Sequence, residues 1–403
     1  MNRVVITGLG AISSLGLKCE EIFTSLKESY SGISSLDFLN VDRLAVRIGG
    51  QIHNYKPEQY FSKQEISLYD KFTQFALIAA HQAVLSSGIE INEENKGKMG
   101  VILGTAGGGL QTQDENYRQV YEEGKNRVHP LIVPKLMNNA AASHVSMKYN
   151  AQGPCFTVAS ACSSSNHAMG QALNLIRNGS VKIVLTGGSE SMLCFGGIKA
   201  WEGLRIMSKE ACRPFCATRD GMVQGEGAAI FIFEDLEQAM KRRANIFAEV
   251  AGFSMSSDAT DIVNPNKEGA ARAIAGALLD AKLNTDDIGY INAHGTGTVA
   301  NDRTECAAIQ EVFKDQAKAL MISSTKSMHG HLIGGTGALE LLSCILAINE
   351  GIVPPTINFK QKDFDCDLDI VPNYARDQKI NCTLSNSFAF GGLNAVLALK
   401  KLV

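Results

Sequence analysis

The fold of this chain can be inferred outward from the segment Ala159-Ser-Ala-Cys-Ser-Ser-Ser-Asn-His-Ala-Met-Gly170. The preceding residues, Cys155–Ser160, are typical of a strand, and the residues from Ser163 onward are typical of a helix. We therefore expect Cys162 at a strand-to-helix corner, where the free N–H groups of the helix N-terminus stabilise a thiolate and lower its pKa. The small neighbouring residues leave room for a thioester, so the pattern predicts a nucleophile. The alternative is an inert thiol, because cysteine is often simply buried.

On either side of this corner, β-branched runs alternate with longer segments of helical period, which is the pattern of an α/β protein. The predicted strands are Arg3–Thr7, Met99–Leu103, Lys182–Thr186, Ala229–Phe233, Tyr290–Ala293, Met321–Ser324 and Ala395–Leu399. The predicted helices are Phe72–Ser87, Ser165–Arg177, Glu268–Ala281, Asp302–Phe313 and Leu339–Ile348. No low-complexity linker interrupts these segments, so any two units of the protein must be tightly joined.

Two turns of the chain resemble each other. Cys162 precedes a helix that runs to Asn178-Gly and a strand, and His331-Leu-Ile-Gly-Gly precedes a helix that runs to Asn349-Glu-Gly and an apolar segment. Both turns place a reactive side chain just before a helix rich in small residues. The similarity indicates an internal duplication, with chance as the alternative. The length of 403 residues also exceeds the size at which one core keeps growing, so two core units are expected.

The composition restricts the class of protein. Apolar residues make up 45% and charged residues 20% of the chain, which is ordinary for a soluble globular protein. A formal charge of −3 argues against a sequence-independent nucleic-acid binder, which needs a basic surface. The start, Met1–Gly10, is typical of a first strand rather than of a signal peptide. The apolar segment Leu339–Ile348 is too short to span a membrane and carries Glu340, so no membrane span is expected.

The ten cysteines are scattered, unlike the dense framework of a small secreted protein, which indicates a reducing cytoplasm. Cys212 and Cys216 have no second pair at zinc-ligand spacing and are interpreted as structural thiols. The early segment Gly8-Leu-Gly-Ala-Ile-Ser13 is a broken dinucleotide fingerprint, because Ser13 replaces its third glycine and no acidic strand end follows about twenty residues later. These observations argue against a nicotinamide-dependent enzyme.

Histidine and lysine side chains follow two later strands. Tyr290-Ile-Asn-Ala-His294 ends a strand and leads into a Gly/Thr loop, and the next turn carries Lys326, His329 and His331. Because histidine titrates near neutrality, these residues and Cys162 resemble an active site at the C-terminal ends of strands. Each histidine taken alone could instead be a packed or capping residue. A metal site made of the cysteine and the histidines is less favoured, because two of the histidines are only two residues apart and the lysine opposes a cation.

The segment Asn386-Ser-Phe-Ala-Phe-Gly-Gly-Leu-Asn394 is glycine-rich and precedes the last predicted strand. A turn of this kind can present backbone N–H groups to an oxyanion, and the alternative is a simple hairpin. Together with Cys162, His294, Lys326 and His331, this segment resembles the β-ketoacyl-[acyl-carrier-protein] synthases of the thiolase superfamily, most closely the synthase II type. The resemblance extends through essentially the whole chain.

The resemblance implies a thiolase-like five-layered αβαβα sandwich of two duplicated halves. The N-terminal half, residues 1–248, would carry the nucleophilic cysteine, and the C-terminal half, residues 249–403, would carry the histidines and the lysine. The family implies an acyltransferase of the cytoplasm that needs no metal or other cofactor, because its substrates are carried on the phosphopantetheine of an acyl carrier protein. The expected partners are that carrier protein and either a second copy of the chain or a homologous ketosynthase-like subunit.

The resemblance also assigns roles. Cys162 would accept the acyl group, with the backbone N–H groups of Cys162 and Phe390 as the oxyanion hole. His294 and His331 would hold the malonyl thioester and support the loss of CO2, and the resulting enolate would attack the acyl group to give a β-ketoacyl thioester. The other residues are assigned as follows: Lys326 as an electrostatic group paired with Glu305, Thr296 and Thr298 on the pantetheine arm, Phe388 in the substrate pocket, and Phe390 as the gate to the acyl pocket.

Several positions depart from the family pattern and leave the substrate and the carrier open. By this resemblance, Gln113 would stand at the floor of the acyl pocket at the dimer interface, where the family commonly has an apolar residue. The basic cluster that would meet the carrier protein is reduced to Lys63, Arg127 and Arg213. Other departures are His329 before Gly330-His331, Ala389 between the two phenylalanines, Leu393 after the glycine pair, and Asp261-Ile-Val263 in a loop near the substrate arm.

Competing functions remain within and beyond this family. The first is elongation of ordinary fatty acyl chains. The second, slightly favoured, is a specialised synthase of a type II polyketide, polyene or nodulation-factor-type pathway. A non-catalytic partner subunit that only sets chain length is a third, and the presence of Cys162 argues against it. A thiolase-type acyl transfer from coenzyme A is the most remote.

Overall fold

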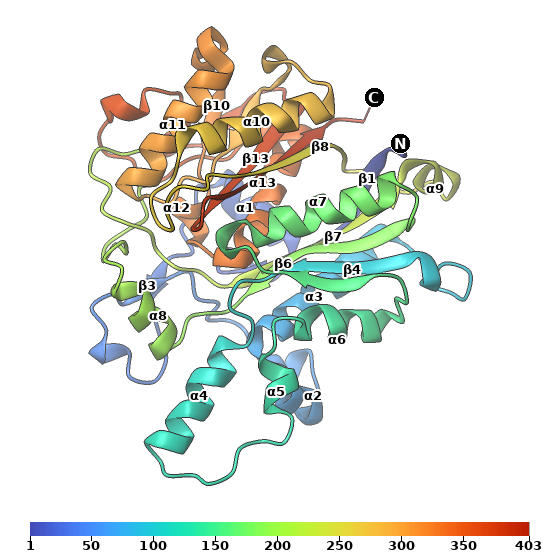
Figure 1. Ribbon diagram of the computed structural model, residues 1–403, viewed down its shortest axis with the longest axis vertical. Coiled ribbons are helices and arrows are strands. Elements are labelled where there is room, and N and C mark those ends of the chain that lie inside the picture. The colour runs from blue at the N-terminus through green and yellow to red at the C-terminus, as the bar shows by residue number, and fades with distance from the viewer. Residues whose placement is uncertain (403) are drawn as a thin grey trace.

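The structure is a computed structural model that describes residues 1–402, and most of its strands join one ten-stranded sheet (Figure 1). The strands of this sheet are β1 (Val4–Ser13), β4 (Met99–Gly104), β5 (Cys155–Val158), β6 (Ile183–Glu190), β7 (Gly227–Asp235), β8 (Ala248–Ser257), β9 (Tyr290–Asn292), β10 (Met321–Ser323), β13 (Cys382–Ala389) and β14 (Leu393–Lys400). Two short pairs lie outside it: β2 (Ser34–Ser35) with β3 (Ile48–Gly49), and β11 (Ile352–Val353) with β12 (Arg376–Asp377).

The sheet consists of two halves with the same topology. From the edge to the middle, the strand order is β5-β4-β6-β7-β1 in the first half and β10-β9-β13-β14-β8 in the second. In each half the three outer strands are parallel, and the remaining two pair antiparallel with their neighbours. A short antiparallel contact between β1 and β8, at Val5–Glu249 and Ile6–Ala248, joins the halves. The identical strand order agrees with the predicted duplication.

Helices cover both outer faces of the halves and fill the space between them. They are α1 (Cys19–Lys27), α2 (Lys63–Leu68), α3 (Lys71–Ser87), α4 (Leu110–Tyr121), α5 (Ile132–Leu136), α6 (Ala140–Tyr149), α7 (Ser164–Arg177), α8 (Phe195–Glu202), α9 (Leu236–Lys241), α10 (Lys267–Ala281), α11 (Val299–Phe313), α12 (Lys326–His329) and α13 (Thr336–Glu350). α3 and α6 pack on the first half of the sheet, and α10 packs on the second half and on α11. α7 and α13 contact strands of both halves, which completes the five layers of the predicted αβαβα sandwich (Figure 1).

The most apolar helix of the chain belongs to this central layer. The stretch Ile333–Glu350 is long and apolar enough, by composition alone, to cross a membrane, yet 89% of it is buried inside the protein. Its side chains pack with α7 and with the strands around it in one core cluster. Burial between the two halves of the sheet therefore accounts for its hydropathy.

Every strand and helix predicted from the sequence is present, but two strands of the large sheet, β8 and β13, were not anticipated, nor were the short strands and several of the shorter helices. β13 includes Ser385, Asn386 and Ser387, which are all buried. Strands are usually predicted from runs of β-branched and apolar residues, so three consecutive polar residues do not indicate a strand. The backbone carbonyl of Ser385 accepts a hydrogen bond from the buried amide of Asn166 in α7 at 3.1 Å, so this strand is joined to the central layer by polar contacts.

Candidate active site

Cys162 lies where the sequence predicts it, in the turn between β5 and α7. Residues Ala161–Ser163 form one 3-10 turn, and Ser164 begins α7. Ala161 has a left-handed backbone with φ of 49°, which makes the turn tight. The hydroxyl of Ser164 accepts the N–H of Ser160 at 2.9 Å and donates to the carbonyl of Ala161 at 2.6 Å. These bonds hold the thiol at the start of α7, where Cys162 is only 6% exposed.

Burial rather than the helix N-terminus dominates the acidity of this thiol. Desolvation raises the pKa of Cys162 to about 12, and the nearby charge of Glu190 adds to the rise. The charge of Lys326 and the backbone N–H groups of Phe390 and Cys162 lower this pKa, but by less. The expectation of a lowered pKa is therefore wrong. The N–H groups of Phe390 and Cys162 also reach the sulfur, and the oxyanion hole expected from them stays a prediction. Because the resting thiol is protonated at neutral pH, it must lose its proton during attack.

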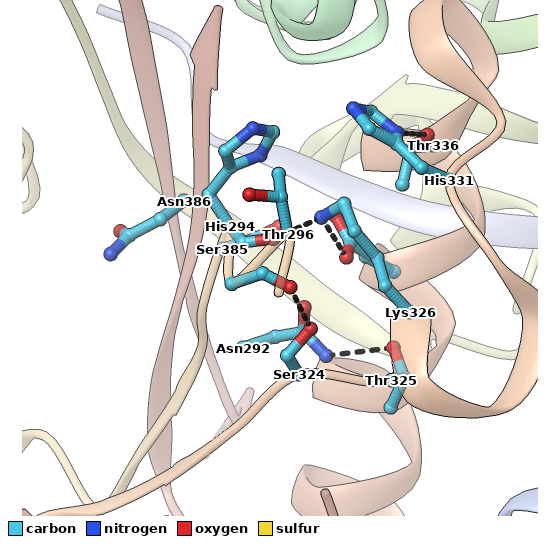
Figure 2. A network of polar contacts seen from close by, with 12 residues as sticks. Asn292, His294, Thr296, Ser324, Thr325, Lys326, His331, Thr336, Ser385 and Asn386 are labelled. Carbon is cyan, nitrogen blue, oxygen red and sulfur yellow. Dashed lines mark hydrogen bonds and ion pairs between the residues drawn. The ribbon is translucent and has the colours of Figure 1, made fainter. Parts of the chain in front are cut away.

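His331 is held in one tautomer. The N–H of Ile333 donates to Nδ1 of His331 at 3.1 Å, so that nitrogen carries no proton in the neutral ring, and the hydroxyl of Thr336 lies 2.8 Å from the same atom (Figure 2). The proton is therefore on Nε2, which has no hydrogen-bond partner within residues 1–402. Burial, followed by the charge of Lys326, holds the pKa of His331 well below its usual value. The ring is a neutral donor with a free N–H.

His294 follows β9 and meets His331 edge to face. The two ring centroids are 5.4 Å apart and the rings are inclined at 82°. Burial and then the Lys326 charge hold the pKa of His294 well below its usual value, so this ring is neutral too. One nitrogen or sulfur atom from each of Cys162, His294 and His331 lies within 4.8 Å of the others. The fold thus brings the predicted nucleophile and the two predicted histidines to one point, although they come from opposite halves of the chain.

The same distances would suit a metal ion, which was the less favoured alternative. His329 does not join the group, because its ring nitrogens bond the carbonyl of Gly330 at 2.7 Å and the hydroxyl of Thr325 at 3.1 Å. The buried ammonium of Lys326 lowers the pKa of His294 and of His331 by its positive charge. The same charge would repel a bound cation, so the chemistry of the site favours a thiol with neutral donors over a metal centre.

Lys326 begins α12, and its ammonium is fully buried. Its Nζ donates to Oε1 of Glu340 at 2.5 Å and to the backbone carbonyl of His294 (Figure 2). The predicted pairing of Lys326 with Glu305 is therefore wrong, and the partner is Glu340 of α13. Glu305 accepts the N–H groups of His294 and Gly295 at 2.8 and 2.7 Å. The two carboxylates hold the His294 segment from both sides: Glu305 binds its N–H groups, and Glu340 binds it through Lys326.

Removing the partner of this buried ammonium should destabilise the protein strongly. We expect Glu340→Gln to lower the free energy of unfolding by roughly 3–5 kcal/mol, because it leaves an uncompensated buried charge. The matched control is Asp367→Asn, whose ion pair with Lys362 has both side chains more than 60% exposed and should contribute less than about 1 kcal/mol. Urea unfolding monitored by circular dichroism measures both changes. Equal losses in the two variants would contradict a structural role for the Lys326–Glu340 pair.

A cavity of about 200 Å³ opens onto the thiol. The predicted substrate residues Thr296, Thr298, Phe388 and Phe390 line it. Its wall also includes Trp201 and Met222, which sequence reasoning did not single out. Glu340 was likewise noticed only as a charge in an apolar helix. None of these stands in a motif of its own, and only the strongly apolar surroundings of Glu340 gave a signal that could have marked it as buried and paired.

The remaining predicted residues lie outside this cavity. Gln113 is half-buried in α4 and is not among the residues that line the cavity in the single chain. Lys63 and Arg127 are exposed, as carrier contacts must be. Arg213 is only 6% exposed and donates to the carboxylate of Glu210 at 2.5 Å and to a backbone carbonyl. Burial makes Arg213 a poor candidate for a contact with another protein.

Comparison with known proteins agrees with this geometry. A family model described as beta-ketoacyl synthase, N-terminal domain, matches residues 1–239, and the corresponding C-terminal domain model matches residues 247–360. The chain belongs to the β-ketoacyl synthase family. It is therefore an acyltransferase-type enzyme, and the resemblance inferred from the sequence is confirmed.

Named relatives of this β-ketoacyl synthase fall into two groups. Nodulation protein E of Rhizobium sp. (strain N33) is 43% identical over 399 residues, which cover 99% of both chains. The 3-oxoacyl-[acyl-carrier-protein] synthase 2 of Staphylococcus aureus (strain COL) is 39% identical over 406 residues, covering 99% of this chain and 98% of the relative. A nodulation protein and a 3-oxoacyl-[acyl-carrier-protein] synthase are thus similarly related to the chain.

Solved structures confirm the thiolase-like ketosynthase fold. The ishigamide ketosynthase/chain length factor superposes with a TM-score of 0.96 at 33% identity, and the alignment covers both chains completely. The ketosynthase in the AntDE:AntF complex, a type II polyketide assembly with an acyl-carrier protein and a bound hexaketide, superposes with a TM-score of 0.91 at 30% identity, again over the whole of both chains. These similarities extend over both halves of the sheet.

Proposed function

We propose that this β-ketoacyl synthase catalyses a decarboxylative Claisen condensation between malonyl-acyl carrier protein and an acyl group held on Cys162. The observation that supports this most directly is the meeting of one thiol and two neutral histidines within 4.8 Å. The test is to incubate the purified enzyme with acyl- and malonyl-carrier protein and to measure CO2 and β-ketoacyl product. Neither product would be expected from a subunit that only sets chain length.

In the first half-reaction the sulfur of Cys162 attacks the acyl thioester carbonyl. The new C–S bond forms as the bond to the carrier sulfur breaks, and the proton of Cys162 leaves with the carrier thiol. The developing oxyanion is stabilised by the backbone N–H groups of Cys162 and Phe390, which already reach the sulfur. A soft, buried nucleophile in a largely dry site favours acyl transfer over hydrolysis.

In the second half-reaction the free N–H of His331, together with His294, donates to the malonyl thioester oxygen. Cleavage of the bond to the carboxylate releases CO2 and leaves its electron pair in an enolate. The enolate carbon attacks the acyl group on Cys162, the C–S bond to Cys162 breaks, and the sulfur takes up one proton. Because the pKa values of both histidines are far below neutrality, they act as hydrogen-bond donors that keep their protons, as an enolate requires.

We propose that both substrates arrive on the phosphopantetheine arm of a carrier protein and that no metal or redox cofactor takes part. Thr296 and Thr298 line the route to the thiol, and their hydroxyls are 2.8 Å apart, so both can turn to the amides of such an arm. Lys63 and Arg127 remain as proposed carrier contacts on the surface. We place the reaction in a reducing cytoplasm, which suits the ten cysteines, all free thiols within residues 1–402.

A second subunit is part of the proposal. β5 forms the edge of the sheet, and its residues Cys155 and Phe156 are exposed there. An exposed strand edge with an aromatic side chain is suited to pairing with another chain. The ishigamide ketosynthase and the ketosynthase ApeO of Xenorhabdus doucetiae are each described with a chain length factor. We propose a dimer, either of this chain with itself or with a homologous ketosynthase-like subunit.

For the substrate, we favour a specialised pathway over ordinary fatty acid elongation. The amide of Gln113 at the proposed floor of the acyl pocket would disfavour a long saturated chain by roughly 1–3 kcal/mol if it had no partner. A functionalised or conjugated chain tolerates an amide better. The similarity to nodulation protein E and to polyketide ketosynthases is in line with this preference.

Gln113→Ile should therefore shift the preference of the enzyme towards longer saturated acyl groups. The roughly 1–3 kcal/mol cost of the unpaired amide corresponds to a shift of roughly 5- to 150-fold in relative kcat/KM. The measurement is a competition assay across acyl-carrier-protein chain lengths. Gln119→Ile, in the same helix α4, serves as the matched control and should leave the profile unchanged. Efficient elongation of a saturated sixteen-carbon primer by the unmodified enzyme would contradict the proposed preference.

A further inference from the structure

The one tryptophan of the chain lies in the active-site wall. Trp201 stands near the end of α8 and stacks on Phe390, with ring centroids 5.9 Å apart and planes inclined at 21°. Both rings line the cavity that opens onto Cys162. A stacked aromatic pair is more stable than its buried area alone implies, so this contact favours one position of the Phe390 ring.

The position of the Phe390 ring is coupled to a catalytic group, because the backbone N–H of the same residue reaches the Cys162 sulfur. The chain after Phe390 is fixed as well. The N–H of Gly391 donates to the carbonyl of Ile262 at 2.8 Å, and the carbonyl of Gly392 accepts from Asp258 at 2.9 Å. The segment is therefore held by two backbone hydrogen bonds on one side and by the tryptophan on the other.

The cavity beside Cys162 leaves little room for a long acyl chain with the rings as they lie. The cavity of about 200 Å³ is smaller than the roughly 300 Å³ of typical ligand pockets. Beyond the thiol, an apolar cluster that includes Leu193, Ile198 and Met222 packs against Trp201 and Ala389. Because protein interiors are close-packed, a chain that enters this cluster must displace side chains. Trp201 belongs to both, because it lines the cavity and packs against the apolar cluster.

We propose that Trp201 is a latch for Phe390: it holds the ring closed so that the Phe390 N–H points at Cys162, and the two rings separate when an acyl chain enters. This inference rests on the proposed acylation of Cys162. Trp201 acts through Phe390 and is a positioning residue. Loading of the acyl chain requires the rings apart, whereas condensation requires them stacked with the N–H in place.

The wild-type chain provides a direct test, because Trp201 is the sole source of tryptophan fluorescence. The octanoyl thioester of N-acetylcysteamine serves as the acyl donor in a stopped-flow experiment. Tryptophan emission should change with the same rate constant as acylation of Cys162, followed by quenched-flow mass spectrometry. The Cys162→Ala protein should show no change, which separates acylation from mere binding. Unchanged emission in wild-type protein that mass spectrometry shows to be acylated would overturn the latch.

A pair of variants tests the positioning role. Trp201→Ala should load acyl groups roughly two- to tenfold faster, the range that corresponds to one lost aromatic stack, and should condense more slowly by a similar factor. Trp201→Phe keeps a ring and should restore both rates. A merely structural defect would slow both steps, and either that result or unchanged rates would contradict the proposal.

Failure of the proposed function would look different. If mass spectrometry finds no acyl group on Cys162 of the wild-type protein, acylation itself is refuted. The latch is then tested by alkylation with iodoacetamide, which needs no acyl transfer. Trp201→Ala should expose the thiol and raise the alkylation rate roughly two- to tenfold over Trp201→Phe. Equal alkylation rates in the two variants would refute the latch.

Discussion

Replacing Cys162 by alanine should abolish condensation while leaving part of the malonyl decarboxylation intact. No other thiol lies at the entrance to α7 to take the acyl group, whereas His294 and His331 keep their positions and their donor protons. The expected result is CO2 release without β-ketoacyl product. Radiometric measurement of CO2 and mass spectrometry of the carrier-bound product follow the two outcomes separately.

Cys19→Ala is the matched control for this experiment. Cys19 is as buried as Cys162, at 6% exposed, and burial raises its pKa to about 12 as well. It lies in α1 and does not belong to the group formed by Cys162, His294 and His331. Its replacement should leave both products unchanged. Acyl-chain elongation by the Cys162→Ala enzyme would refute the assignment of the nucleophile.

The two histidine variants should separate acylation from condensation. His294→Ala and His331→Ala should still carry an acyl group on Cys162, because their proposed task is to stabilise the enolate. Each should lose about 10²–10³ in the rate of condensation, the usual effect of removing one oxyanion donor. Intact-mass analysis after incubation with acyl-carrier protein reports the acyl load, and product analysis reports condensation.

His144→Ala controls for the loss of a partly buried imidazole. Burial lowers the pKa of His144 too, but this residue lies in α6 outside the catalytic cavity. Its replacement should leave both steps intact. Because the pKa of Cys162 is about 12, its thiol carries a proton that must be removed during acylation. If neither His294→Ala nor His331→Ala can be acylated, a histidine must remove the thiol proton, and the assigned division of labour is wrong.

Much of the fold could be predicted because its signals are local. The strand-to-helix corner at Cys162 and the helical period of α7, α10 and α13 lie in consecutive residues. The duplication was visible in the sequence as two similar turns. The two halves of the sheet have the same strand order, so the two turns occupy equivalent places in them. β13 was missed because its buried polar residues imitate a loop. The division of the chain at residue 248 stays a prediction.

The errors at the site concern quantities that a sequence does not encode locally. Glu305 was chosen as the partner of Lys326, but the contact belongs to Glu340 of α13, the next long helix along the chain, whose inward-facing side the sequence did not reveal. The pKa of Cys162 was expected to fall because the helix N-terminus is a local feature, whereas the burial that raises it is produced by the whole fold. Arg213 was expected at the surface for the same reason. The tryptophan over Phe390 belongs to no motif, so only its position reveals it.

The way the two halves are joined has a kinetic consequence. β1 and β8 pair across the middle of the sheet, and α7 and α13 each pack on strands of both halves. Such a body has no hinge, so opening and closing cannot take the form of one half rotating against the other. The slow motions of turnover must then be local rearrangements of side chains and of the loops that carry them, on the microsecond-to-millisecond scale of such motions. An inhibitor that fixed only the Phe390 segment would therefore arrest the whole catalytic cycle.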